Sequence, residues 1–405
     1  MQPFGEGNTA FMLISAALVM IMTPGLAFFY GGLVSRKNVL AIMIQSFVSM
    51  GWTTFLWWAC GYSLTFSGGH GGLIGDFHKA FLLGVKPGDV FSATNNIPLL
   101  VLFVYQMMFA IITPALITGA FANRIRFGAY MIFLTLWMFC VYFPVAHNVW
   151  GDGLFAHNWG VLDFAGGTAV HTTAGFAALA SVLFVGRRKV METEPHNIPF
   201  VALGAGLLWF GWYGFNAGSE LRVDSVTTVA FANTDLAASV AAITWLAIAW
   251  VFEKKPKFVG LLTGAVAGLV AITPAAGYVS IGGSVAIGFL ASAFCYLAVQ
   301  FKNRMGLDDA LDVWGVHGIG GVIGCICTGI FASRAWNPSG ADGLLLGGRH
   351  FFMMETLSVL IVAAYAFAFS YVALWAINFI IPVKASAEEE EMGLDAAEHG
   401  EQAYV

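Results

Sequence analysis

The chain has 405 residues, of which 59% are hydrophobic and 10% charged. Soluble domains average roughly 45–50% apolar and about 25% charged residues, so the composition excludes an ordinary soluble protein and predicts a helical membrane protein. The formal net charge of −5 says little about partners and gives no indication of nucleic-acid binding, because seven of the 23 acids lie close to the C-terminus: Glu388 to Glu391, Asp395, Glu398 and Glu401.

Apolar runs of about 20 residues follow one another along the chain, and each is long enough to cross a hydrocarbon core of roughly 30 Å. They predict eleven transmembrane helices in an all-α polytopic fold. The predicted spans are 9–33, 39–66, 94–122, 127–147, 163–185, 199–218, 225–252, 257–276, 281–301, 311–333 and 350–382.

Basic residues are concentrated in alternate loops between these spans. With the N-terminus outside, the inner loops and the C-terminal segment hold 13 of the 18 lysines and arginines. The positive-inside rule therefore predicts an outer N-terminus and an inner C-terminus, in the cytoplasmic membrane. An odd number of spans agrees with this orientation. Residues 1–383 are predicted to form the membrane domain, and residues 384–405 a cytoplasmic tail.

Two histidines fall inside predicted spans, His171 in the fifth and His317 in the tenth. Their matching positions suggest a repeat of five spans plus five, in opposite orientations, followed by a final helix. An ionisable side chain at membrane depth is costly and usually marks a functional site. Glycines around both residues allow close helix approach, which would bring the two rings into contact. Packing, haem ligation and a proton relay all remain open.

Aromatic residues accompany the histidines. In the sixth span, Trp212, Phe215 and Ser219 share one helical face, a pattern compatible with a small cation site. Trp150 follows the fourth span, and Phe109 lies in the third. The alternative is that these side chains belong to interfacial belts and bundle packing, as most aromatics of this chain must.

Acidic residues near the spans have two interpretations. Asp163 precedes His171 by just over two helical turns and is predicted either to cap the fifth span or to act in the site. Asp312, at the start of the tenth span, has the same capping alternative. Asp235 lies within the seventh span without an evident role. The acidic tail, poor in apolar residues, is predicted to be a solvated or disordered extension.

Several sequence blocks resemble the ammonium transporter family, which includes the methylammonium permeases and Rhesus proteins. The blocks, in the family's order, are TPGLAFFYGGLVSRKNVL, ANRIRF, PVAHNVWGDG, LDFAGGTAVH, WFGWYGFNAGS, GAVAGLVAITPAAGYVS, DVWGVHGIGGVIGCICTGIF and GLDAAEHGEQAYV. They cover nearly the whole chain and are most similar to the prokaryotic Amt type. The resemblance implies a homotrimer of eleven-helix subunits, each with its own pore.

The resemblance also assigns roles to individual residues. It implies an outer ammonium recruitment site of Trp150, Phe109 and Ser219, supported from behind by Asp163. It further implies a phenyl gate of Phe109 and Phe215 above the twin histidines, His171 and His317. Further pore-lining positions are Phe29, Trp212, Thr273 and Trp314, the last standing where the family is expected to have phenylalanine.

The implied function is transport of ammonium and methylammonium, not enzymatic catalysis, and no metal or cofactor is implied. NH4+ would lose its proton and cross as NH3, with separate proton transfer along the histidines. The alternatives are an electroneutral NH3 channel of the Rhesus type and an ammonium sensor. The resemblance also implies that the tail packs beneath neighbouring subunits and accompanies control by a P-II signalling protein at the cytoplasmic face.

Overall fold

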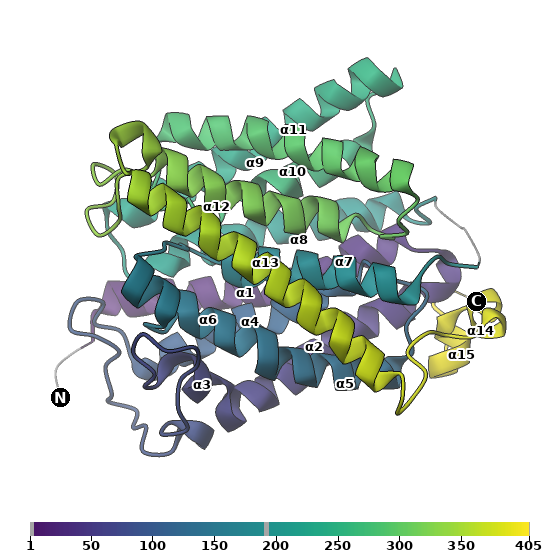
Figure 1. The fold of residues 1–405 in the computed structure, drawn as a ribbon, viewed down its shortest axis with the longest axis horizontal. Helices are drawn as coiled ribbons and strands as arrows, with labels where there is room; N and C mark the ends of the chain where they lie inside the picture. The colour runs from purple at the N-terminus through teal and green to yellow at the C-terminus, as the bar shows by residue number, and fades with distance from the viewer. Residues whose placement is uncertain (1–3, 190–193, 405) are drawn as a thin grey trace.

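The computed structural model describes residues 4–189 and 194–404, which form one helical bundle and, in these ranges, no β-strand beyond two isolated bridges (Figure 1). The long helices run side by side, and the helices of the C-terminal tail lie at one end of them, here called the inner end. The principal helices are α1 (Glu6–Leu33), α2 (Val39–Leu56), α3 (Tyr62–Phe66), α4 (Leu99–Ile117), α5 (Phe127–Trp137), α6 (Phe143–Trp150), α7 (Thr173–Val185), α8 (Ile198–Ala217), α9 (Ser225–Glu253), α10 (Phe258–Ile272), α11 (Ile281–Met305), α12 (Ile319–Phe331), α13 (Arg349–Ile377), α14 (Ala387–Met392) and α15 (Leu394–His399).

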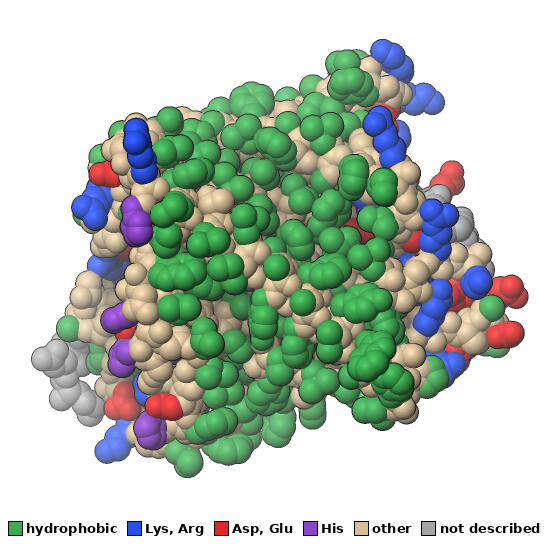
Figure 2. Space-filling view, viewed as in Figure 1, with side chains coloured by type: hydrophobic (Ala, Val, Ile, Leu, Met, Phe, Trp, Pro, Cys, Tyr) green, Lys and Arg blue, Asp and Glu red, His purple; other side chains and the backbone are tan. Residues whose placement is uncertain are grey.

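The predicted class of fold is confirmed. Within the described residues, ten helical segments are long and apolar enough to cross a membrane, some of them made of two consecutive helices. An eleventh apolar helix, α10, has 15 residues. At 1.5 Å per residue it reaches about 22 Å, short of a full hydrocarbon core. Figure 2 shows hydrophobic side chains in a broad band across the face in view and charged ones toward its two ends.

The first and sixth predicted spans, α1 and α8, pack against each other more extensively than any other pair of helices. Glycines allow this approach. A Cβ atom on Gly204 would lie 2.2 Å from the backbone nitrogen of Phe29, and one on Gly32 would lie 2.6 Å from the carbonyl oxygen of Asn197. Small residues are the usual means by which membrane helices pack closely, and here they join the two predicted halves of the chain.

Each histidine lies in a short π-helical turn at the start of a broken helix. His171 belongs to η6 (Gly167–Thr172), which continues into α7, and His317 belongs to η8 (Trp314–Gly318), which continues into α12. π-turns widen a helix locally and are frequent at functional sites. The two broken helices therefore present their histidines from corresponding positions.

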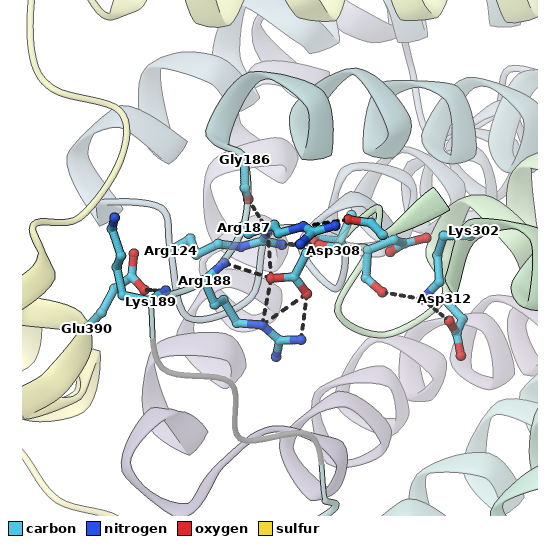
Figure 3. Close-up of polar contacts among 12 residues, drawn as sticks. Arg124, Gly186, Arg187, Arg188, Lys189, Lys302, Asp308, Asp312 and Glu390 are labelled. Carbon is cyan, nitrogen blue, oxygen red and sulfur yellow. Dashed lines mark hydrogen bonds and ion pairs between the residues drawn. The ribbon is translucent and has the colours of Figure 1, made fainter. Parts of the chain in front are cut away.

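An aspartate lies eight residues before each histidine, ahead of the π-helical turn. Asp163 accepts hydrogen bonds from four successive backbone amides, Gly166 to Ala169, at 2.7–3.0 Å. Asp309 accepts bonds from the amides of Val313 and Trp314, at 3.1 and 2.8 Å. The capping interpretation is thus confirmed for Asp163. It is wrong for Asp312, whose carboxylate instead pairs with Lys302 (Figure 3).

The prediction from composition that the tail is solvated or disordered is wrong, because its helices α14 and α15 dock on the inner end of the bundle (Figure 1). Glu389 pairs with Arg126 at 2.8 Å, and Asp395 accepts a 2.8 Å hydrogen bond from the amide of Ala41. The amide of Ala385 donates to the carbonyl oxygen of Arg124 at 2.8 Å. Composition misled here because Glu389 and Asp395 bind distant parts of the chain: Arg126 at the start of α5 and the first turn of α2.

A buried charge cluster lies beside the docked tail. Figure 3 shows Arg124 and Arg188 converging on the carboxylate of Asp308. Their shortest contacts with it are 3.4 and 2.6 Å. Burial raises the pKa of Asp308, but the hydrogen bond from Arg188 and the charge of Arg124 outweigh that effect and leave the pKa below its usual value. The cluster fixes the chain immediately before the capping residue Asp309.

Glycines also decide how closely the two broken helices cross. A Cβ atom on Gly175 would lie 2.1 Å from the backbone of Gly318, next to His317. We therefore expect Gly175→Ala to force the helices apart, at a cost of about 1–3 kcal/mol, and to lower the melting temperature of the purified protein. Gly206→Ala on α8 is the matched control, because its Cβ would meet nothing within 4 Å. Equal melting temperatures for the two variants would contradict this account of the crossing.

Candidate functional site

A cavity of about 660 Å³ opens at the outer end of the bundle, opposite the tail. All four residues of the predicted recruitment site line it: Trp150 at the end of α6, Phe109 on α4, Ser219 after α8 and Asp163 before η6. Sequence positions more than a hundred residues apart thus come together in one chamber.

Asp163 orders this chamber from behind. Its backbone carbonyl accepts a 2.8 Å hydrogen bond from the indole nitrogen of Trp150, while its carboxylate is taken up by the four amides of the following turn. Next to it, the buried carboxylate of Glu355 accepts a 3.0 Å bond from the amide of Leu162, another lining residue. The carboxylate of Asp163 is therefore committed to the helix end, and Trp150 is held by the same residue's backbone.

Ser219 is oriented by a residue that the sequence did not single out. Its hydroxyl donates to the carbonyl oxygen of Phe215 at 2.9 Å. The buried hydroxyl of Tyr105 lies 3.2 Å from the Ser219 hydroxyl and 2.9 Å from the carbonyl oxygens of Gly214 and Phe215. Tyr105 precedes Phe109 by one helical turn, and its ring contacts the ring of Phe109 edge-on, at 5.1 Å. In the sequence, only its position one helical turn before Phe109 could have pointed to Tyr105.

Two phenyl rings form the floor of the outer cavity. The ring centroids of Phe109 and Phe215 are 4.2 Å apart with their planes tilted by 31°, and both side chains are buried. Trp150 meets Phe109 edge-on at 5.8 Å. Phe109 lines the outer cavity and Phe215 lines the next one, so this ring pair separates the two.

Below the rings is a narrow cavity of about 10 Å³, room for hardly one water molecule. The residues that line it include His171, His317, Trp212, Phe215 and Phe29, and Tyr30 and several aliphatic side chains complete the wall. The predicted pore residues of the middle section thus face one small, apolar space.

The two histidines are in direct contact. Their Nδ1 atoms lie 3.3 Å apart, and both side chains are buried. Between two neutral rings, one Nδ1–H donates the hydrogen bond and the other Nδ1 accepts it, so the accepting ring carries its hydrogen at Nε2. The contact leaves no space for a haem between the rings, which removes the haem-ligand interpretation of this pair. His171 also stacks on Trp212, with centroids 5.5 Å apart.

A third cavity, of about 610 Å³, opens toward the inner end. It shares Phe29, Tyr30, Val266 and His317 with the narrow cavity, and Asp312 also lines it. Two of the predicted pore-lining residues, Thr273 and Trp314, line neither the narrow cavity nor the inner one. Thr273 lies behind the wall and accepts a 2.9 Å hydrogen bond from Trp212, whereas Trp314 lies in η8.

The sequence matches the model of the Ammonium Transporter Family over residues 10–404. The chain belongs to the ammonium transporter family. It is 44% identical to the ammonium transporter of Bacillus subtilis over 98% of each chain. It is 42% identical to the ammonium transporter Amt1 of Archaeoglobus fulgidus, over 99% of this chain and all of the other. These relatives are transporters, not enzymes.

Solved structures of the family share the fold. Mep2 of Saccharomyces cerevisiae superposes with a TM-score of 0.89 at 35% identity, over 98% of this chain and 91% of that one. A structure described as a sensor Amt protein superposes with a TM-score of 0.87 at 28% identity, over 97% and 98% of the two chains. The resemblance drawn from the sequence blocks is confirmed, and the chain is a multi-pass membrane protein of this family.

The hydrogen bond between Trp212 and Thr273 yields a prediction for the wall of the narrow cavity. We expect Thr273→Val to destabilise the protein by about 1–3 kcal/mol, because the buried indole N–H loses its acceptor. Ammonium uptake should also slow, since Trp212 stacks on His171. Melting temperature and uptake into liposomes would both be measured. Thr273→Ser keeps the hydroxyl and serves as the control; equal losses in both variants would refute the role of the hydrogen bond.

Proposed function

We propose that this protein transports ammonium by separating it: NH4+ is recruited in the outer cavity and deprotonated, NH3 crosses the narrow cavity, and the proton follows along His171 and His317. The observation that carries the proposal is the order of the three cavities, with a pair of contacting phenyl rings above a contacting histidine pair. A polar chamber, a hydrophobic barrier and a proton-transferring pair follow one another in the order that this chemistry needs.

The outer cavity suits a small cation. Trp150 and Phe109 offer aromatic faces, which attract a cation by about 0.5–2 kcal/mol each depending on desolvation. Ser219 adds a hydroxyl oxygen able to accept a hydrogen bond from NH4+. Methylammonium keeps the charge and three N–H donors, so it is expected as a second substrate.

Selectivity against K+ follows from the narrow cavity. NH4+ and K+ are similar in size and charge, so the outer cavity alone separates them poorly. Moving either ion into a medium of dielectric constant about 4 carries an idealised cost of order 20 kcal/mol. NH4+ avoids that cost by leaving its proton behind, which K+ cannot do.

The proposed transport is electrogenic. A contacting pair of imidazoles supplies a donor and an acceptor for stepwise proton transfer, which passive solvation of NH3 would not require. Each proton that follows inward gains about 2.3 kcal/mol per 100 mV of membrane potential. An electroneutral NH3 channel would gain nothing from the potential.

Current measurements on liposomes that contain the purified protein test this directly. We expect an ammonium pulse to produce a transient inward current, a methylammonium pulse a smaller one, and a K+ pulse none. Uptake without current would support the electroneutral alternative, and binding without either would support the ammonium sensor.

A charged residue in place of either histidine should degrade selectivity. We expect His171→Asp and His317→Asp to raise K+ uptake by about tenfold or more, because a fixed carboxylate offsets part of the desolvation barrier and each 1.4 kcal/mol changes a rate about tenfold. His78→Asp is the control, since His78 is exposed on an outer loop. Unchanged exclusion of K+ in both pore variants would overturn the selectivity argument.

We further propose the arrangement that family membership favours: a homotrimer in the cytoplasmic membrane, with the N-terminus outside and the tail in the cytoplasm. Basic residues gather at the inner ends of α1, α7, α9 and α11 and in the loops that follow them, which supports this orientation. Residues 1–383 would then be the transport domain, and residues 384–405 a regulatory segment available to a P-II signalling protein.

A further inference from the structure

Three charged side chains form a chain beside the outer cavity. Glu220, which ends the turn η7 (Gly218–Glu220), pairs with Arg222 at 2.9 Å, and Arg222 pairs in turn with Asp224 at 2.7 Å. Only Glu220 of the three lines the cavity, directly after Ser219. Two carboxylates share one guanidinium, so the group has more acid than base.

Hydrogen bonds to its backbone hold this charged segment in place. The carbonyl oxygens of Glu220 and Leu221 accept long bonds from the side-chain amide of Asn95, and the amide of Val223 donates to the side chain of Asn8 at 3.0 Å. Asp224 also caps α9 through a capping box with Thr227. The position of Glu220 relative to Ser219 is therefore built by three separate parts of the chain.

The other charged groups of the cavity do not duplicate Glu220. Asp163 also lines it, but four backbone amides occupy its carboxylate. Arg334 and His350 line the cavity as well. Neither is an acid, and the positive charge of Arg334 repels a cation. Of the two acids that line the cavity, Glu220 is the one paired with another side chain, whereas Asp163 is bound by backbone amides of a helix end.

We propose that Glu220 sets the affinity for ammonium, and that Arg222 limits it. The Glu220 carboxylate attracts NH4+ toward Ser219, and the Arg222 guanidinium competes for the same carboxylate. The inference rests on the proposed function and names a residue outside the aromatic and serine site. Because the interaction is electrostatic and partly exposed to solvent, it should weaken as ionic strength rises.

The test compares four proteins in liposomes at pH 8: the wild type, Glu220→Gln, Arg222→Gln and the double variant. We expect Glu220→Gln to raise the KM for ammonium about threefold to tenfold with maximal uptake nearly unchanged. Arg222→Gln should lower the KM by a similar factor, because NH4+ no longer competes with the guanidinium for the Glu220 carboxylate. The double variant should resemble Glu220→Gln, since Arg222 acts through Glu220.

Two controls separate this effect from general charge and from folding. Glu6→Gln removes an exposed acid that does not line the cavity and should leave the KM unchanged. Melting temperatures identify variants whose fold is impaired, and Arg222→Gln keeps the capping box of Asp224. Raising the salt concentration should bring the KM of the wild type and of Glu220→Gln closer together.

The outcomes distinguish the two proposals. If the wild type transports ammonium but Glu220→Gln keeps the wild-type KM, the role of Glu220 is refuted and the transport proposal stands. If Arg222→Gln raises the KM, Arg222 supports the site instead of competing, and the inference fails. If the wild type transports no ammonium, the proposed function itself fails.

Discussion

The rule that every buried backbone amide needs a partner shapes this structure more than any other. Two helices begin inside the protein, and their first amides have no helical acceptor. Asp163 and Asp309 supply the acceptors, and each does so eight residues before a histidine. Without these caps, neither broken helix could start at the depth where its histidine meets the other one. The capping acids thus help to determine where along the bundle the two histidines meet.

Glycines determine how closely the two histidine-bearing helices approach each other. The caps fix how far along each helix the histidines sit, whereas the small residues at the crossing fix how far apart they sit. Gly175 against Gly318, and Gly321 against Gly167, leave no space for a methyl group between the backbones. The 3.3 Å contact between the imidazoles is therefore a product of backbone geometry and does not depend on an attraction between the rings.

Much of this was accessible from the sequence. Hydropathy located the long helices, because an apolar run of about twenty residues is typical of a membrane span, and the sequence blocks indicated the family. Spacing could not choose between roles for Asp163, and it pointed to Asp312 where Asp309 is the capping residue. Tyr105 was missed because its partners, Ser219 and the carbonyl oxygens of Gly214 and Phe215, lie on another part of the chain that no local pattern records. Glu220 pairs with its sequence neighbour Arg222, but only the fold shows that it lines the outer cavity. The tail was misjudged because its acids find partners in loops far away in sequence.

The narrow cavity has a consequence for the kinetics of the protein. Its volume of about 10 Å³ leaves room for hardly one molecule of the size of water. Under the proposed function, we expect each crossing to require a movement of Phe215 or its neighbours, because the rings of Phe109 and Phe215 are in contact above this cavity. The maximal rate of the proposed transport would then depend on side-chain motion in the packed core, and its temperature dependence would be independent of the affinity of the outer cavity for the cation.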